Sequence, residues 1–145
     1  MSRSAARAIV SHITSSLFSD RFVTLVIGAR DLPKKPTDFH VLLVSSILGL
    51  EPGREYREDE VNDELQRWVL LFGSNFGVDH VTLRRHLVDA KHLSRDPAGE
   101  AYRLRSPDHP YSYDPGIRSI DLQALISKAR KEREMRKQQY SRTSQ

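Results

Sequence analysis

The residue types that most often perform chemistry occur in this sequence, but their spacing does not match a catalytic or metal-binding site. His80, His86 and His92 are six residues apart, so no two share a helix face as zinc ligands at i and i+4 would. The chain has no cysteine, which excludes a thiolate zinc site and a cysteine nucleophile. It also lacks the P-loop, G-x-G-x-x-G and H-E-x-x-H motifs. We therefore expect no catalytic residue, no metal and no cofactor, and we predict that the protein is not an enzyme.

The carboxylates at Glu58, Asp59 and Glu60 form the densest cluster of acidic residues, and two interpretations apply to it. Such a cluster could bind a metal ion or supply a general acid. Carboxylates in the first turn of a helix, however, are stabilised by the positive end of the helix dipole, and this explanation is simpler. His40 has no second histidine at i+4, so we expect it to face solvent or to form a hydrogen bond.

A helix is predicted from His80 to about His92, because Asp79 is a suitable N-cap and apolar residues recur at helical spacing. At 100° per residue, Leu83, Leu87 and Ala90 point together into the core. The polar residues on the opposite side of this predicted helix are Thr82, Arg85, His86, Asp89 and His92.

The two adjacent arginines of this helix are expected to lie in different environments. Arg84 lies beside the buried sector, so we predict that it is partly buried against a carboxylate, either Glu58 or Glu60. Arg85 faces outward and is available to a partner. The predicted internal polar framework comprises Glu58, Glu60, Asn62, Arg84 and Asp89.

A β-hairpin is predicted over residues 93–105, where an Asp-Pro-Ala-Gly sequence fits a type I turn. In its second strand Tyr102 and Leu104 share one face, because side chains alternate along a strand. Arg103 and Arg105 share the other face. The hairpin is therefore expected to have an apolar inner side and a basic outer side.

The first 31 residues are predicted to form a helix over 5–18 and then a short strand over 21–27. Continuation of the helix through the second segment is the alternative. The basic, Ser- and Ala-rich start is similar in composition to a transit peptide, but its apolar residues repeat at helical spacing, which favours an amphipathic helix.

Two further helices, over residues 37–48 and 58–71, precede the arginine-bearing helix. Thr37 or Asp38 is the expected cap of the first. A Pro- and Tyr-rich strap or linker follows the hairpin, and Ser119 is the expected cap of a last helix that continues as a basic tail. The predicted regions are an N-terminal helix and strand (1–31), a winged-helix-like domain (32–105), the strap (106–116) and the C-terminal basic helix or tail (117–145).

The expected fold class is mainly α with a small β hairpin, arranged like a winged helix-turn-helix with an extra N-terminal helix and a C-terminal helical tail. The central residues also resemble a known family. REYREDEVN at residues 54–62, followed by Leu65, matches the signature R-x-Y-x-E-x-E-V-N-x-x-L, and TLRRHLVD at 82–89 matches its second half. LPKK at 32–35 is similar to the L-P-x-K that precedes the signature.

By these motifs the chain resembles the bacterial family catalogued as domain of unknown function two-thousand-and-eighty-seven. The resemblance implies a winged-helix-like module, sometimes fused behind a helix-turn-helix regulator, and implies no established activity. Two features differ from the signature. The connector between Leu70 and Val78 is longer, and Arg57 stands where a Ser or Thr cap is usual.

Charge is unevenly distributed along the chain, which carries a net charge of +4. Residues 51–70 are acidic, whereas the hairpin and the C-terminal tail are basic. No stretch approaches the roughly 20 apolar residues needed to span a bilayer, so no membrane association is expected. The absence of cysteine suits a reducing, cytoplasmic location.

Two functions remain open from the sequence. The first is transcriptional regulation by binding double-stranded DNA, and the residues expected to carry it are Thr82, Arg85, His86, Lys91, Arg103 and Arg105. The second is a protein-interaction or regulatory module that keeps the winged-helix shape without binding DNA. Its partner would be another protein or a second copy of the chain.

Overall fold

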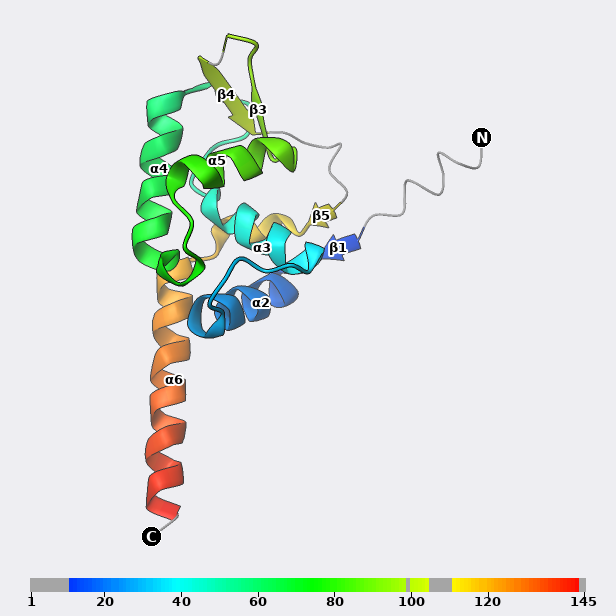
Figure 1. Cartoon of the computed structure of the whole chain (residues 1–145). Helices are drawn as coiled ribbons and strands as arrows, with labels where there is room; N and C mark the ends of the chain where they lie inside the picture. Colours follow the sequence, from blue (N-terminus) through cyan, green and yellow to red (C-terminus); the bar gives the residue numbers. More distant parts are fainter. Residues whose placement is uncertain (1–10, 99, 105–110, 144–145) are drawn as a thin grey trace.

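The fold is mainly helical with a small antiparallel sheet, as shown by the computed structural model in Figure 1, which describes residues 11–98, 100–104 and 111–143. The α-helices are α2 (Ser15–Gly28), α3 (Pro36–Ser46), α4 (Glu58–Phe72), α5 (His80–Asp89) and α6 (Leu122–Thr143). The strands are β1 (Ser11–Ile13), β2 (Tyr56–Arg57), β3 (Leu93–Arg95), β4 (Ala101–Leu104) and β5 (Tyr111–Tyr113). The predicted class, mainly α with a small hairpin, is confirmed.

The predicted strand over residues 21–27 is wrong, because this segment lies within α2. Phe18, Phe22 and Val26 recur every fourth residue and are buried, so the β-branched sequence is used as one face of a helix. The Thr14 side chain caps the helix by accepting a hydrogen bond from the Leu17 backbone N–H at 3.0 Å. Continuation of a helix through 21–27, the alternative, is confirmed.

The predicted first helix over 5–18 is only partly correct. Residues 5–10 lie outside the described residues, and residues 11–13 form β1 rather than helix. β1 pairs in parallel with β5, with His12 opposite Ser112. Because the two strands lie near opposite ends of the sequence, no local pattern signals this pairing.

The helices α3 and α4 lie close to the predicted ranges. α3 begins at Pro36, and neither Thr37 nor Asp38 caps it. Asp38 is buried instead and accepts two hydrogen bonds from the Arg21 guanidinium, at 2.8 and 3.0 Å, which ties α3 to α2. The core face of α4 consists of four buried residues and the half-buried Val69; the buried ones are Val61, Leu65, Trp68 and Phe72.

The long connector between α4 and α5 is packed onto the core. Its middle forms a short 3-10 helix, η1 (Ser74–Phe76), and Phe76 and Val78 are buried. The Asn75 side-chain amide donates to the Val26 carbonyl oxygen of α2 at 2.7 Å. The extra residues of this connector therefore fasten the α4–α5 turn to α2.

The helix α5 ends at Asp89, three residues before the predicted end. The chain reverses at Lys91, whose φ of +67° is left-handed, and the His92 N–H donates to the Leu87 carbonyl oxygen at 2.9 Å. This is the Schellman arrangement, in which glycine is the usual left-handed residue. His92 therefore lies beyond the helix and is buried, so the prediction that it lies on the helix side opposite the core is wrong.

The predicted hairpin is present as β3 and β4, and a third strand, β2, pairs with the other edge of β4. The sheet order is β2-β4-β3, with Tyr56 opposite Tyr102 and Arg95 opposite Tyr102 on the two sides. Tyr56 and Tyr102 are both buried and join the sheet to the helical core. The strand β2 was not predicted, because it is only two residues long.

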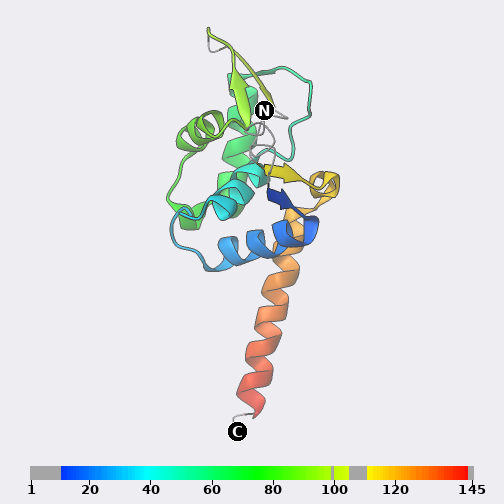
Figure 2. The same cartoon turned by 90° about the vertical axis from the view of Figure 1, so that its right-hand side faces the viewer.

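The predicted strap is partly outside the described residues, and its remainder forms β5 and a second 3-10 helix, η2 (Pro115–Ser119). Ser119 lies in η2 and does not cap α6. The cap is Asp121, whose side chain accepts from the Ala124 N–H at 3.0 Å. α6 packs against α2 and then projects well beyond the rest of the fold, as both Figure 1 and Figure 2 show.

Candidate functional site

A polar cluster that joins three elements surrounds Arg84 of α5. Its side chain is 18% exposed; one terminal nitrogen donates to the Asn62 side-chain oxygen, and the other lies 3.7 Å from Glu58 Oε1. The guanidinium carbon lies 6.0 Å from the centre of the Tyr102 ring. The prediction that Arg84 is partly buried beside Glu58 is confirmed.

Glu58 connects this arrangement to the sheet. The Tyr102 hydroxyl donates to Glu58 Oε1 at 2.9 Å. Burial raises the pKa of Tyr102, and the hydrogen bond to Glu58 adds to that increase. One carboxylate thus joins α4, α5 and β4, and this fixes how α5 is rotated about its axis.

The other two predicted framework residues, Glu60 and Asp89, lie outside this cluster. Glu60 Oε1 accepts a hydrogen bond from the Arg57 backbone N–H at 2.9 Å, and the Arg54 guanidinium donates to the other oxygen, Oε2, at 3.3 Å. Glu60 therefore stabilises the start of α4. Asp89 is exposed at the end of α5. Within the described part of the chain it forms no ion pair.

The outward face of α5 carries part of the predicted binding set. Thr82 and Arg85 are exposed, as expected. His86 is only half-buried and its ring packs edge-on against Phe39 of α3, with ring centres 5.4 Å apart. Lys91 is exposed in the reversal after α5. Thr82, Arg85 and Lys91 are therefore open to a partner, whereas one side of His86 is already covered.

The basic side of the hairpin differs from expectation. The exposed Arg103 pairs with the equally exposed Glu55 at 2.7 Å, so its charge is balanced locally. Arg105 lies outside the described residues. Arg95, at the end of β3, is exposed and forms no ion pair among the residues that the structure describes. Sequence reasoning missed Arg95 as a binding candidate, although a basic residue beside the predicted turn was a visible signal.

A histidine pair joins α3 to the segment after α5. His40 Nδ1 and His92 Nε2 are 2.9 Å apart, in hydrogen-bonding contact. Of the two expectations for His40, facing solvent or forming a hydrogen bond, this contact agrees with the second. In the described ranges, no group of three His, Asp or Glu side chains could hold a metal ion.

A second polar chain was not detectable from the sequence. His12 lies between Ser112 Oγ, at 2.8 Å from Nδ1, and Asp114 Oδ1, at 2.6 Å from Nε2. The Ser15 backbone N–H donates to the other Asp114 oxygen, and this bond, with the one to His12, lowers the pKa of Asp114. Serine, histidine and aspartate are the residues of a serine hydrolase, but in this protein they fasten β1 and β5 to the start of α2.

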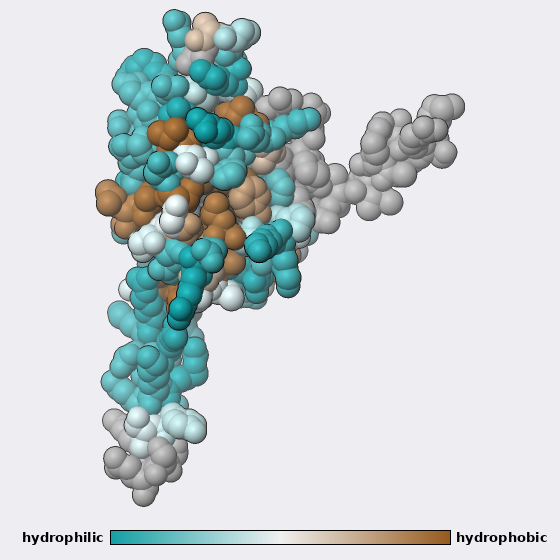
Figure 3. Space-filling view, in the orientation of Figure 1, coloured by the Kyte–Doolittle hydropathy of each residue, from teal (hydrophilic) through white to brown (hydrophobic). Residues whose placement is uncertain are grey.

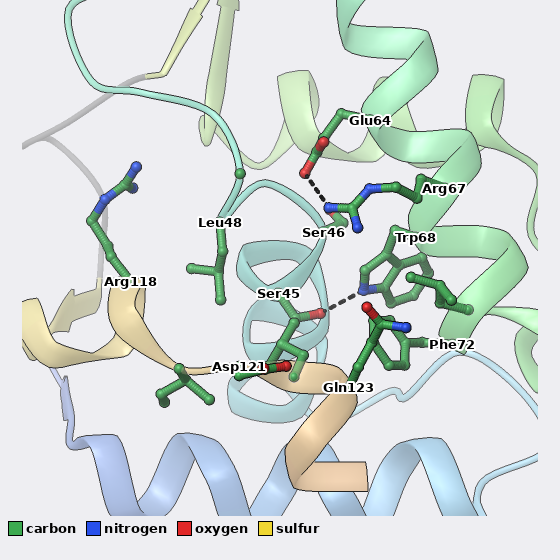
Figure 4. Close-up of a pocket in the computed structure, with 14 residues that line it drawn as sticks. Ser45, Ser46, Leu48, Glu64, Arg67, Trp68, Phe72, Arg118, Asp121 and Gln123 are labelled. Atoms are coloured by element: carbon green, nitrogen blue, oxygen red, sulfur yellow. Dashed lines mark hydrogen bonds and ion pairs between the residues drawn. The ribbon is translucent and has the colours of Figure 1, made fainter. Parts of the chain in front are cut away.

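Figure 4 shows a cavity of about 230 Å³ between the end of α3, α4 and the start of α6. Two pairs of its polar groups contact each other: Trp68 Nε1 donates to Ser45 Oγ at 3.0 Å, and Arg67 lies 3.5 Å from Glu64. A volume below the usual range of about 300–1,000 Å³ for ligand sites does not favour a small-molecule ligand.

No helix in the described ranges is long and apolar enough to cross a membrane. A comparison with protein-family models matches residues 30–104 to an uncharacterized protein family conserved in bacteria, DUF2087. No curated protein and no solved structure matched the chain. The matched residues contain α3, α4, α5 and the three-stranded sheet, with Arg84, Glu58 and Asn62 among them. The chain therefore belongs to the bacterial DUF2087 family.

Proposed function

We propose that the protein is a winged-helix protein that binds double-stranded DNA through α5 and the β3–β4 hairpin. The support is topological. A helix, a short strand, two helices and a two-stranded hairpin follow one another as α3, β2, α4, α5, β3 and β4, and β4 lies between the other two strands. In helix-turn-helix proteins the second helix of the pair lies in the major groove. In this chain α5 is the second helix of the pair that it forms with α4.

The observation that carries the proposal is the different environments of Arg84 and Arg85: Arg84 is partly buried in polar contacts, and Arg85 is exposed. Arg84 is committed to Glu58 and Asn62, and this holds α5 so that Thr82 and Arg85 point away from the core. On a duplex of any sequence an exposed arginine on such a helix can neutralise a phosphate, and at a specific site it can bind guanine through two hydrogen bonds. Lys91 lies in the reversal after α5 and Arg95 at the end of β3, and both are exposed and therefore available for phosphate contacts.

The number of available cations sets the expected strength of binding. Arg85, Lys91 and Arg95 are exposed and unpaired within the described residues, while Arg103 is neutralised by Glu55, and Asp89 repels phosphate. With about three phosphate contacts, the logarithm of the affinity should fall with the logarithm of salt concentration with a slope of roughly −3 from these residues. Binding to bacterial DNA would make transcriptional regulation the role and the cytoplasm the location.

Fluorescence anisotropy with a labelled random-sequence duplex, at about 50 and about 200 mM salt, tests the proposal. We expect binding at low salt that weakens as salt rises, and weaker binding by the Arg85→Ala variant. Arg30→Ala is the matched control, because Arg30 is an exposed arginine in the connector between α2 and α3. Absence of binding at low salt, or equal losses in the two variants, would contradict the proposal.

A protein-interaction module is the second candidate, and one observation favours it. Leu70 on α4 is 84% exposed and its neighbour Leu71 is 37% exposed, which places two large apolar side chains on the surface. If the chain self-associates through them, Leu70→Glu should reduce the mass measured by light scattering. Unchanged mass would exclude self-association through this surface.

A further inference from the structure

The helix α6 differs from the rest of the fold in how its charges are arranged. Six arginines in the body of the protein lie within 4 Å of a carboxylate: Arg21, Arg54, Arg57, Arg67, Arg84 and Arg103. Residues 128–137 of α6 contain six basic and two acidic side chains, and none of them forms an ion pair within the described residues. The projecting part of α6 therefore carries a net positive charge. Figure 3 shows the visible face of this part as hydrophilic.

The basic side chains of α6 are not spread evenly around it. At 100° per residue, the face that carries Ile126 and Ala129 continues outward through Arg133, Lys137 and Tyr140. Ile126 is 3% exposed and anchors the start of the helix against the body. We call the outward continuation the basic stripe, and it comprises Arg130, Arg133, Arg136, Lys137 and Tyr140.

The acidic residues of α6 flank the stripe, and Glu132 lines the same groove beside α2 as Arg133 and Arg136. Glu132 and Glu134 lie about 100° to either side of Arg133. Arg133, Arg136, Lys137, Tyr140 and Ser141 line a shallow, open surface along the stripe. Tyr140 is 77% exposed there, so an aromatic ring lies among the cations.

The body of the protein fixes the direction of the stripe. α6 packs against α2, and a groove between the two helices is lined by Val23, Ile27 and Leu125 as well as by Arg133 and Arg136. Arg133 and Arg136 of the stripe therefore lie beside the docked part of α6, whereas Lys137 and Tyr140 do not line this groove. In both Figure 1 and Figure 2, α6 projects from the end of the molecule opposite the β3–β4 hairpin.

We infer that α6 binds the phosphodiester backbone of nucleic acid through the basic stripe, as a surface separate from α5. Arginine and lysine side chains that neutralise phosphates provide sequence-independent affinity. The exposed ring of Tyr140 can stack on an unpaired base beside them. This inference does not rest on the proposal for α5.

An anionic membrane surface is the other polyanion that such a helix could meet, and the composition of α6 disfavours it. A helix that lies in a membrane interface buries large apolar side chains on the face opposite its charges. The face opposite the stripe carries Lys128, Lys131 and Gln138, with Met135 as its apolar residue. That face therefore lacks the large apolar side chains that a helix needs to insert into a membrane interface.

A pair of matched double variants tests the inference. Arg133→Gln/Lys137→Gln removes two charges from the stripe, whereas Lys128→Gln/Lys131→Gln removes two from the opposite side. Glutamine is a good helix former, so α6 should persist in both, which circular dichroism would verify. Anisotropy with a labelled duplex and with a labelled single strand would be measured against salt.

The stripe variant should bind more weakly. On the duplex its salt slope should become less steep by about 1.8, because two phosphate contacts disappear. The opposite-face variant should keep the wild-type slope. Equal losses in both variants, or no loss in either, would overturn the inference. So would tighter binding to vesicles that contain anionic lipid than to nucleic acid.

The same measurements separate this inference from the proposal for α5. If only the α5 proposal fails, Arg85→Ala will have no effect while the stripe variant still weakens binding. If only the α6 inference fails, Arg85→Ala will weaken binding and the stripe variant will match the opposite-face variant.

Discussion

Replacing Arg84 with alanine should destabilise the protein far more than replacing its neighbour Arg85. Arg84 donates a charge-assisted hydrogen bond to Asn62, and such bonds contribute about 1.5–3 kcal/mol. The contact with Glu58 is 3.7 Å long and Glu58 is 44% exposed, so it adds less than about 1 kcal/mol. We expect Arg84→Ala to lower the free energy of unfolding by about 2–3 kcal/mol.

Arg85 is exposed and outside this network, so Arg85→Ala should change the same quantity by less than about 0.5 kcal/mol. Urea unfolding followed by circular dichroism would measure both variants, and thermal unfolding should show Tm lower by roughly 10 °C for Arg84→Ala. A double-mutant cycle with Asn62→Ala should give a coupling energy of about 1 kcal/mol or more. Equal effects of the two arginine variants, or a larger effect of Arg85→Ala, would show that α5 is rotated differently about its axis.

Two further predictions concern the backbone reversal after α5 and the fastening of β5. Lys91→Gly should raise the free energy of unfolding by about 1 kcal/mol, because φ at this position is +67° and glycine avoids the cost that a side chain adds in the left-handed region. Lys91→Ala keeps a side chain and should change the free energy of unfolding little. Equal free energies of unfolding for the two variants would contradict this prediction. Asp114→Asn should be less stable than the wild type at neutral pH, because hydrogen bonds to Ser15 N–H and His12 lower the pKa of Asp114 in the folded state. A lowered folded pKa stabilises above the unfolded value of 3.8, so the difference in urea midpoint should shrink as pH falls through the folded pKa. A difference that stays constant from neutral to acid pH would count against it.

The parts of the fold that the sequence predicted are those encoded locally. α4 and α5 each have an apolar face at helical spacing, and the Asp-Pro-Ala-Gly turn marks the hairpin. The misassigned segment, 21–27, is β-branched and aromatic, and its burial on one side of α2 outweighs that local preference. β1 and β5 depend on a pairing across the length of the chain, which periodicity cannot detect.

The candidate site divides in the same way. The different environments of Arg84 and Arg85 follow from helix phase and were predictable. The pairing of Arg103 with Glu55, the contact of His86 with Phe39 and the burial of His92 were not. Each arises where separate elements meet, so tertiary packing rather than local pattern determines it.

The central claim, that α5 and the β3–β4 hairpin bind DNA, is tested most directly by nuclear magnetic resonance. ¹⁵N-labelled protein would be titrated at low salt with a random-sequence duplex, and backbone amide shifts would be followed. We predict that the amides of α5 around Thr82 and Arg85, together with those at Arg95, move with increasing DNA. Shifts confined to α6, or no shifts at all, would contradict the claim.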